Sequence, residues 1–228
     1  MKFYTIIPAS GSGKRFKSRT PKQFFKIEGR EIISYVLRKF NSLREIDYIV
    51  ISTQINYFKR IEKIVLDNEF EKVKSIIEGG DERMDSVYNA LRLLKCEKDD
   101  FIIVHDAVRP FITTKKIKEL IRAAKVYNSV VPALKLNDTI KKADKKNIFE
   151  KNIEREGLFR IQTPQIFRYD ILMESFKKAY KEKFFGTDES SIVQFAGYPV
   201  RIIEGERTNI KVTTKEDLQF NRLFKYLY

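Results

Sequence analysis

Short apolar runs alternate with segments in which apolar residues recur at helical spacing, and this alternation continues along most of the chain. Tyr48–Ile51 and Phe101–Val104 are typical of strands that are covered on both faces, whereas the apolar residues between positions 32 and 40 follow a helical period. Strands that alternate with helices build parallel sheets. We therefore predict an α/β fold, a mostly parallel twisted sheet flanked by helices, in a single domain spanning residues 1–228.

The same patterns place the individual elements. We expect strands at residues 3–8, 47–53, 73–78, 101–105, 129–134, 199–204 and 209–212. We expect helices at residues 31–42, 56–68, 82–95, 114–127, 169–181 and 188–197, and a terminal helix from residue 214. Asp81 or a neighbour is expected to cap the third of these helices.

Residues 136–156 depart from this pattern. Two weakly apolar arms surround a charged Asp-Lys-Lys-Asn centre, which indicates a hairpin that leaves the core. Such a β-arm needs a surface to pack on.

Length and composition exclude several classes of protein. A chain of 228 residues with 43% hydrophobic residues can bury a core without disulfides or structural metals. Cys96 is the single cysteine, so the chain has no intramolecular disulfide and no cysteine-based zinc cluster. The first apolar stretch is too short for a signal peptide, and no run is long enough to span a membrane. We expect a cytoplasmic protein with no membrane partner.

The net charge of +14 has several interpretations. It would attract nucleic acid, an anionic membrane or small phosphorylated ligands, and most of the lysines are spread along helical segments as on ordinary solvated faces. A basic nucleic-acid-binding module remains an alternative, although the cations form no stripe and no RNA-binding or helix-turn-helix motif is present. A non-catalytic nucleotide sensor is a third reading.

The loop after the first predicted strand is rich in small residues. It reads Pro-Ala-Ser-Gly-Ser-Gly-Lys-Arg from Pro8 to Arg15, at the carboxyl end of a strand, where open α/β sheets bind ligands. Neither a Walker loop nor a dinucleotide fingerprint is complete here. A glycine turn followed by Arg15 and Lys22 would allow the backbone and both cations to bind one polyphosphate. A plain tight turn with two solvated cations fits the same spacing equally well.

Four ordered blocks extend this loop into a resemblance that covers about residues 4–220. The segment Ile7–Phe24 resembles the signature of nucleotidyltransferases, and Gly79–Val87, Val104–Phe111 and Thr163–Phe167 are similar to the cytidylyltransferases that make CDP-linked polyols. Within that family the blocks are most similar to the enzymes that act on 2-C-methyl-D-erythritol 4-phosphate in isoprenoid synthesis. Enzymes acting on D-ribitol 5-phosphate are close relatives, and no residue here excludes that substrate. Ser10 is a departure, since alanine is usual at that position.

The resemblance implies a Rossmann-like nucleotidyltransferase fold and a reaction without a covalent nucleophile. A phosphate monoester oxygen attacks the α-phosphorus of CTP and pyrophosphate leaves. A phosphomonoester is already largely a dianion at neutral pH, so no general base is needed. Catalysis would instead depend on cationic side chains, backbone N–H groups and Mg²⁺ as the divalent cofactor, which hold the two anions in line and stabilise the developing charge. His105, the single histidine, is therefore expected to be structural.

The resemblance also implies roles for individual residues. Arg15 and Lys22 would stabilise the transition state, and Asp106 would contact the ribose or a metal held mostly by phosphates. The CTP-binding residues would be Pro8, Ala9, Ser10, Gly11, Ser12, Gly13, Gly80, Asp81, Arg83, Ser86, Asp106 and Ala107. For Asp81 and Ser86 a helix-start role fits the sequence equally well.

The polyol phosphate needs its own contacts. Arg155 and Lys211 would position its phosphate, and Arg109, Thr139, Thr163 and Thr187 would complete the second-substrate site; Arg109 fits a loop brace equally well. Arg155 lies at the end of the predicted β-arm, and in the family that arm reaches a partner subunit. The resemblance thus implies a homodimer with sites completed in trans.

Overall fold

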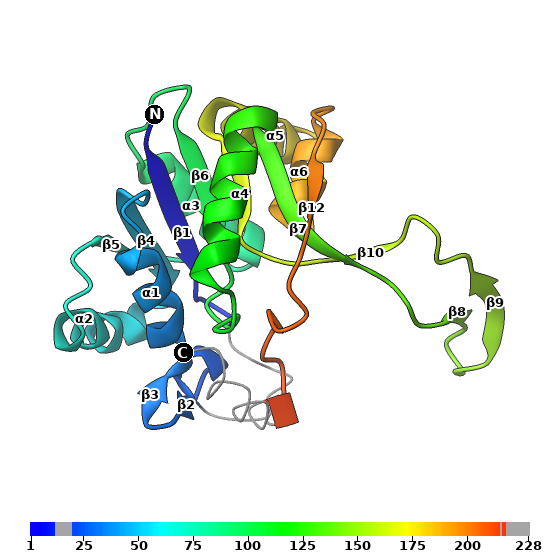
Figure 1. Cartoon of the computed structure of the whole chain (residues 1–228), viewed down its shortest axis with the longest axis horizontal. Helices are drawn as coiled ribbons and strands as arrows, with labels where there is room; N and C mark the ends of the chain where they lie inside the picture. Colours follow the sequence, from blue (N-terminus) through cyan, green and yellow to red (C-terminus); the bar gives the residue numbers. More distant parts are fainter. Residues whose placement is uncertain (12–19, 215, 218–228) are drawn as a thin grey trace.

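The computed structural model describes residues 1–11, 20–214 and 216–217; the expected terminal helix falls almost entirely outside them. Within these residues, the central sheet has eight strands in the order β10-β7-β11-β6-β1-β4-β5, and β12 also pairs with β7 (Figure 1). These strands are β1 (Phe3–Pro8), β4 (Tyr48–Thr53), β5 (Val73–Glu78), β6 (Phe101–Val104), β7 (Ser129–Lys135), β10 (Phe159–Ile161), β11 (Gln165–Arg168) and β12 (Arg201–Glu204).

The pairing is mostly parallel, as predicted. β1 pairs in parallel with β4 and β6, β4 with β5, and β7 with β12. β11 is antiparallel to both β6 and β7, and β10 is antiparallel to β7. The sequence analysis predicted neither β10 nor β11.

Six α-helices in the described part of the chain cover the two faces of the sheet (Figure 1). They are α1 (Ile32–Ser42), α2 (Phe58–Asp67), α3 (Arg83–Leu93), α4 (Thr114–Tyr127), α5 (Tyr169–Lys181) and α6 (Glu189–Phe195). Alternate residues of β1 separate the core into two layers. Phe3 and Ile7 pack with α1, α2 and α4, whereas Tyr4 and Ile6 pack with α3, α5 and α6. The predicted helices and strands that form agree with these bounds within two residues.

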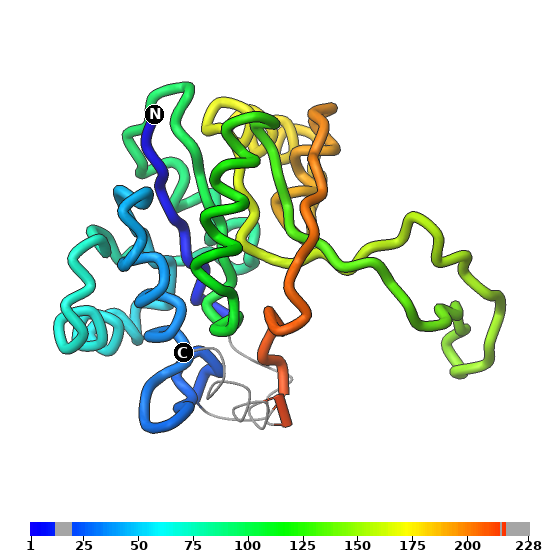
Figure 2. Tube along the Cα trace, in the orientation of Figure 1, coloured from blue at the N-terminus to red at the C-terminus, as the bar shows by residue number. Residues whose placement is uncertain are grey.

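Short elements complete the described chain. Two 3₁₀ helices span Lys22–Phe24 and Ile55–Tyr57, and a small hairpin pairs β2 (Lys26–Ile27) with β3 (Arg30–Glu31). The β-arm pairs β8 (Ile140–Ala143) with β9 (Phe149–Ile153) in antiparallel fashion, which confirms the predicted hairpin. It projects far from the sheet at the end of two extended connections (Figure 2). None of the helices among the described residues has the length and apolar character needed to cross a bilayer.

The expected strand at 209–212 is wrong. This segment is irregular because its backbone groups bond within a turn, to the loop after β6 and to side chains, and do not form a ladder with a neighbouring strand. The Asn209 carbonyl accepts from Arg109 Nη1 at 2.9 Å and from Gln162 Nε2 at 3.1 Å, and Asn209 Nδ2 donates to the Thr163 carbonyl. The segment is thereby tied to the end of β6, which places Lys211 near that end.

Candidate active site

A cavity of about 800 Å³ lies where the parallel strands β1, β4, β5 and β6 end. Ligand sites in open α/β sheets occupy this edge, because the loops leaving the carboxyl ends of the strands converge there. The predicted residues that line this cavity are Pro8, Ala9, Ser10, Gly11, Lys22, Gly80, Asp81, Arg83, Ser86, Asp106, Ala107 and Lys211. Residues from three of the four sequence blocks, together with Lys211, therefore meet at the carboxyl edge of the sheet.

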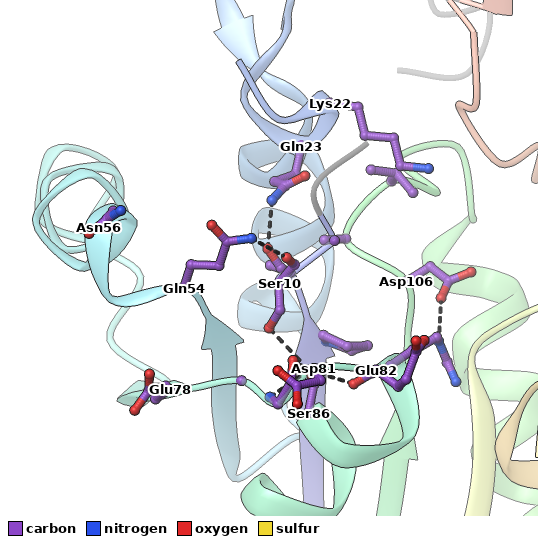
Figure 3. Close-up of a pocket in the computed structure, with 18 of the residues that line it drawn as sticks. Ser10, Lys22, Gln23, Gln54, Asn56, Glu78, Asp81, Glu82, Ser86 and Asp106 are labelled. Atoms are coloured by element: carbon purple, nitrogen blue, oxygen red, sulfur yellow. Dashed lines mark hydrogen bonds and ion pairs between the residues drawn. The ribbon is translucent and has the colours of Figure 1, made fainter. Parts of the chain in front are cut away.

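The loops after β1 and β5 are in close contact at the base of this cavity (Figure 3). Ser86 Oγ lies 3.1 Å from Ser10 Oγ, and Ser10 Oγ donates to the Ser52 carbonyl at 3.2 Å. A Cβ atom on Gly79 would lie 1.7 Å from Ser10 Oγ, so only glycine allows this approach. The Ser10 hydroxyl connects the loop after β1 to Ser52 in β4 and to Ser86 in α3.

The start of α3 faces the same cavity. The residue that caps it is Glu82, whose side chain forms a capping box with Asp85, so the neighbour of Asp81 fills the predicted role. Asp81 itself is exposed and lines the cavity. Ser86 lies inside the helix, where its Oγ accepts from the Gly80 N–H at 3.1 Å and thereby holds the glycine turn against the helix.

Asp106 is buried among cationic side chains at the edge of this cavity. Its Oδ1 lies 3.2 Å from Arg83 Nε, and its Oδ2 lies 3.2 Å from Arg109 Nε and 3.0 Å from Lys211 Nζ. Burial raises the pKa of Asp106, but the charges of Arg83, Lys211 and Arg109 outweigh this effect and hold the pKa well below its ordinary value. Asp106 is therefore ionised at neutral pH and gathers three cations at one point.

A second cavity, of about 420 Å³, adjoins the first. Arg83, Asp106 and Lys211 line both cavities, and Arg109, Thr163 and Thr187 line the second. Arg109 also braces its loop, through its contacts with Asp106 and with the Asn209 carbonyl. The two cavities thus share a boundary made of one anion and two cations.

His105 is fully buried beneath this boundary. Its Nε2 lies 3.1 Å from the Arg109 carbonyl, which only accepts, so Nε2 carries the proton and Nδ1 accepts from Thr163 Oγ1 at 3.0 Å. Thr163 Oγ1 accepts in turn from the Asp106 N–H at 3.1 Å. Burial lowers the pKa of His105 to about 3. These contacts favour a structural role for His105. The Thr163 hydroxyl, which donates to His105, in turn fixes the Asp106 backbone.

The remaining predicted residues either lie outside the described part of the chain or line neither cavity. Ser12, Gly13 and Arg15 lie outside the described residues. Thr139 and Arg155 are exposed at the base of the β-arm and line neither cavity. Arg155 Nη1 donates instead to the Asn137 carbonyl of its own chain.

Comparison with known proteins finds relatives that match almost the full length of the chain. The family model for 2-C-methyl-D-erythritol 4-phosphate cytidylyltransferase matches residues 3–224. The chain belongs to this family of nucleotidyltransferases. A member from Dictyoglomus thermophilum is 40% identical over 95% of this chain and 94% of its own length, and one from Geobacillus kaustophilus is 38% identical over 96% and 95%.

Solved structures of family members have the same fold. The 2-C-methyl-D-erythritol 4-phosphate cytidylyltransferase of Francisella tularensis matches with a TM-score of 0.85 and 30% identity, covering 98% of this chain and 99% of that one. The Thermus thermophilus enzyme matches with a TM-score of 0.80 and 26% identity, covering 99% of this chain and all (100%) of that one.

The structure adds cavity residues that sequence reasoning missed in this cytidylyltransferase. In the first cavity these are Gln23, Gln54, Ile55, Asn56, Glu78, Gly79, Glu82, Val108 and Thr213. In the second they are Ile161, Gln162, Gln165, Asp188, Ser190, Ser191 and Gln194. Residues that follow directly on a predicted strand, such as Gln54 and Gly79, could have been found by their position. Several of the others lie on regular elements, with Ser190, Ser191 and Gln194 on α6 and Gln165 on β11, and a periodic pattern does not show which residues of an element face a cavity.

Proposed function

We propose that this chain transfers the cytidylyl group of CTP to 2-C-methyl-D-erythritol 4-phosphate, with CTP in the first cavity and the polyol phosphate in the second. The products are 4-CDP-2-C-methyl-D-erythritol, an intermediate of the non-mevalonate isoprenoid route, and pyrophosphate. The boundary shared by the two cavities carries this proposal. The reacting phosphates must meet where the two sites touch, and there the chain places Arg83, Asp106 and Lys211.

The reaction forms one P–O bond and breaks another. An oxygen of the polyol phosphate attacks the α-phosphorus of CTP, and the bond to the β-phosphate breaks as pyrophosphate leaves. The attacking phosphomonoester is already anionic, so no side chain has to remove a proton. The neutral, doubly hydrogen-bonded His105 fits this requirement. Catalysis consists of holding two anions in line and stabilising the charge that develops.

Cytosine recognition is assigned to the loop after β5. The base presents an exocyclic amine that donates beside ring atoms that accept, so its pocket needs an acceptor next to a donor. Backbone groups around Gly80, the Asp81 carboxylate and the Ser86 hydroxyl supply both kinds at the end of the first cavity. Arg15 and Lys22 would stabilise the transition state, with Lys22 lining the same cavity.

Asp106, the carboxylate that lines both cavities, is already paired with Arg83, Arg109 and Lys211, so a Mg²⁺ ion that arrives with the nucleotide would be held mostly by phosphate oxygens. Mg²⁺ prefers oxygen ligands and is usually held by one or two carboxylates together with substrate phosphates. Asp106 is the carboxylate that both cavities share in the described part of the chain, and its Oδ1 has Arg83 Nε as its ion-pair partner. When bound, Mg²⁺ would offset negative charge on the triphosphate, with Asp106 as the protein ligand.

The β-arm supports a homodimer with sites completed in trans. The β-arm projects away from the sheet (Figure 1), and Arg155 and Thr139, in the segments that connect it to the sheet, line neither cavity of the same chain. The arm also exposes Ile148 by 62% and Phe149 by 69%, which is typical of a surface that another chain covers. The partner's arm would therefore bring Arg155 and Thr139 to the polyol phosphate.

Composition and charge also bear on the location of the enzyme and on its partners. Cys96 is the single cysteine, which suits a reducing compartment, so we place the enzyme in the cytoplasm. The net charge of +14 would draw two polyanionic substrates together, without a nucleic acid or a membrane as partner.

Pyrophosphate release tests the proposal. The chain is incubated with CTP and either 2-C-methyl-D-erythritol 4-phosphate or D-ribitol 5-phosphate, with Mg²⁺ and, as a control, with a chelator. We expect release with the methylerythritol phosphate that depends on the metal. Faster release with D-ribitol 5-phosphate would contradict the proposed substrate. No release with either polyol phosphate would contradict the proposed reaction.

A further inference from the structure

Arg83 is held by two carboxylates at the boundary of the cavities. Its Nη1 and Nη2 donate to Glu189 Oε1 and Oε2 at 2.7 and 2.9 Å, and its Nε donates to Asp106 Oδ1 at 3.2 Å. The Glu189 side chain has no exposed surface. Burial lowers the pKa of Arg83, but Glu189 and Asp106 outweigh it and raise that pKa, so the guanidinium is permanently charged.

This ion pair joins the starts of two helices. Arg83 is the first residue of α3 and Glu189 is the first residue of α6. The loop before α3 contains Gly80 and Asp81, which line the first cavity, and the loop before α6 contains Thr187, which lines the second. The Arg83–Glu189 pair therefore connects the loops of the two proposed substrate sites.

Glu189 also determines which way the guanidinium points. An arginine has five N–H groups in a rigid plane, and the contacts among the described residues use three of them. With two groups fixed on Glu189 and one on Asp106, the plane cannot rotate, and its remaining N–H groups stay at the boundary. Glu189 itself lines neither cavity, and its hydrogen bonds among the described residues go to Arg83, which lines both.

We propose that Glu189 is a positioning residue that fixes Arg83 across the boundary and so supports the binding of both substrates. The inference rests on the proposed function, which assigns CTP to the first cavity. It goes beyond the predicted site because Glu189 lies on the helix of the second cavity. A change in Glu189 should nevertheless weaken the binding of CTP in the first.

The test replaces the carboxylate with an amide of the same shape. Glu189→Gln keeps one acceptor but places an NH₂ group opposite a guanidinium N–H, so the two-point contact is lost. We expect the Kd of CTP, measured by calorimetry without the second substrate, to rise about tenfold, and the KM of the polyol phosphate to rise as well. In an Arg83→Ala background the same substitution should change the Kd of CTP by less than about twofold, because Arg83 transmits the effect.

Two further variants make the result decisive. Glu174→Gln makes the same change on α5, where Glu174 accepts from the Tyr198 hydroxyl at an exposed site, and should leave both constants unchanged. Glu189→Asp keeps the charge but shortens the side chain, and should also raise the Kd of CTP; it serves if the glutamine variant does not fold.

A rise confined to the KM of the polyol phosphate would overturn the proposal, since it would mean that Glu189 acts only within the second cavity. An undiminished effect in the Arg83→Ala background would overturn it too. Failure of the unmodified chain to bind CTP would instead contradict the proposed function itself.

Discussion

At the scale of single residues, burial changes the chemistry of side chains whose type alone says little. Asp106 and His105 are adjacent in the sequence, and the fold gives them opposite roles. Three cations keep Asp106 ionised in a buried position, whereas burial keeps His105 neutral with both ring nitrogens hydrogen-bonded. The Asp106 carboxylate therefore carries its charge at the boundary of the cavities. His105 holds Thr163, which in turn fixes the Asp106 backbone.

The pKa of His105 predicts how stability depends on pH. Its pKa is about 3 in the folded chain, against about 6.5 in the unfolded chain, so the unfolded state binds the extra proton as the pH falls between these values. The free energy of unfolding should therefore fall by about 2 kcal/mol between pH 7 and pH 5, measured by urea denaturation. His105 is the only histidine, so His105→Gln should remove this slope. An equal slope in that variant would contradict the assignment.

At the scale of elements, the two helices that begin beside the cavities have side-chain caps at their starts. Glu82 and Asp85 close the start of α3, and Asp188 and Ser191 close the start of α6. α4 begins away from the cavities, with Thr113 Oγ1 accepting from the Lys116 N–H at 3.1 Å. Fixed helix starts hold the loops of the site in place.

The cap of α4 allows stability to be changed without touching the site. Thr113 lines neither cavity, and its hydroxyl also bonds to the Glu206 carboxylate. Thr113→Ala should lower the free energy of unfolding by about 1 kcal/mol and leave the kinetic constants unchanged. Thr113→Ser should retain the stability, because it retains the hydroxyl. Equal losses in both variants, measured by urea denaturation, would show that the methyl group matters instead.

At the scale of the whole molecule, the order of the strands assembles the site. β1, β4, β5 and β6 are neighbours, so the loops after them meet although they are far apart in the chain. The β-arm instead leaves the sheet (Figure 1), and Arg155 beside it lines neither cavity of its own chain. A dimer with a twofold axis would return each arm to the other subunit's site.

Mixed dimers test that arrangement. Arg155→Ala and Lys211→Ala should each reduce turnover at least about a hundredfold, because each removes a cation from the polyol phosphate. When the two variants are allowed to exchange subunits, each mixed dimer has one site with Lys211 from one chain and Arg155 from the other. Turnover should then recover to about a quarter of the unmodified level. No recovery would mean that Arg155 serves its own chain or no site at all.

The sequence by itself determined the α/β class, most element bounds, the hairpin of the β-arm and the residues after β1, β5 and β6 that line the first cavity. Those features depend on local period and on short motifs, which are present in consecutive residues. The tertiary structure alone decided the antiparallel position of β11, the irregular course of residues 209–212 and the pairing of Arg83 with Glu189. Each of these depends on polar groups far apart in sequence that find partners only when the chain is packed, so no local pattern encodes them.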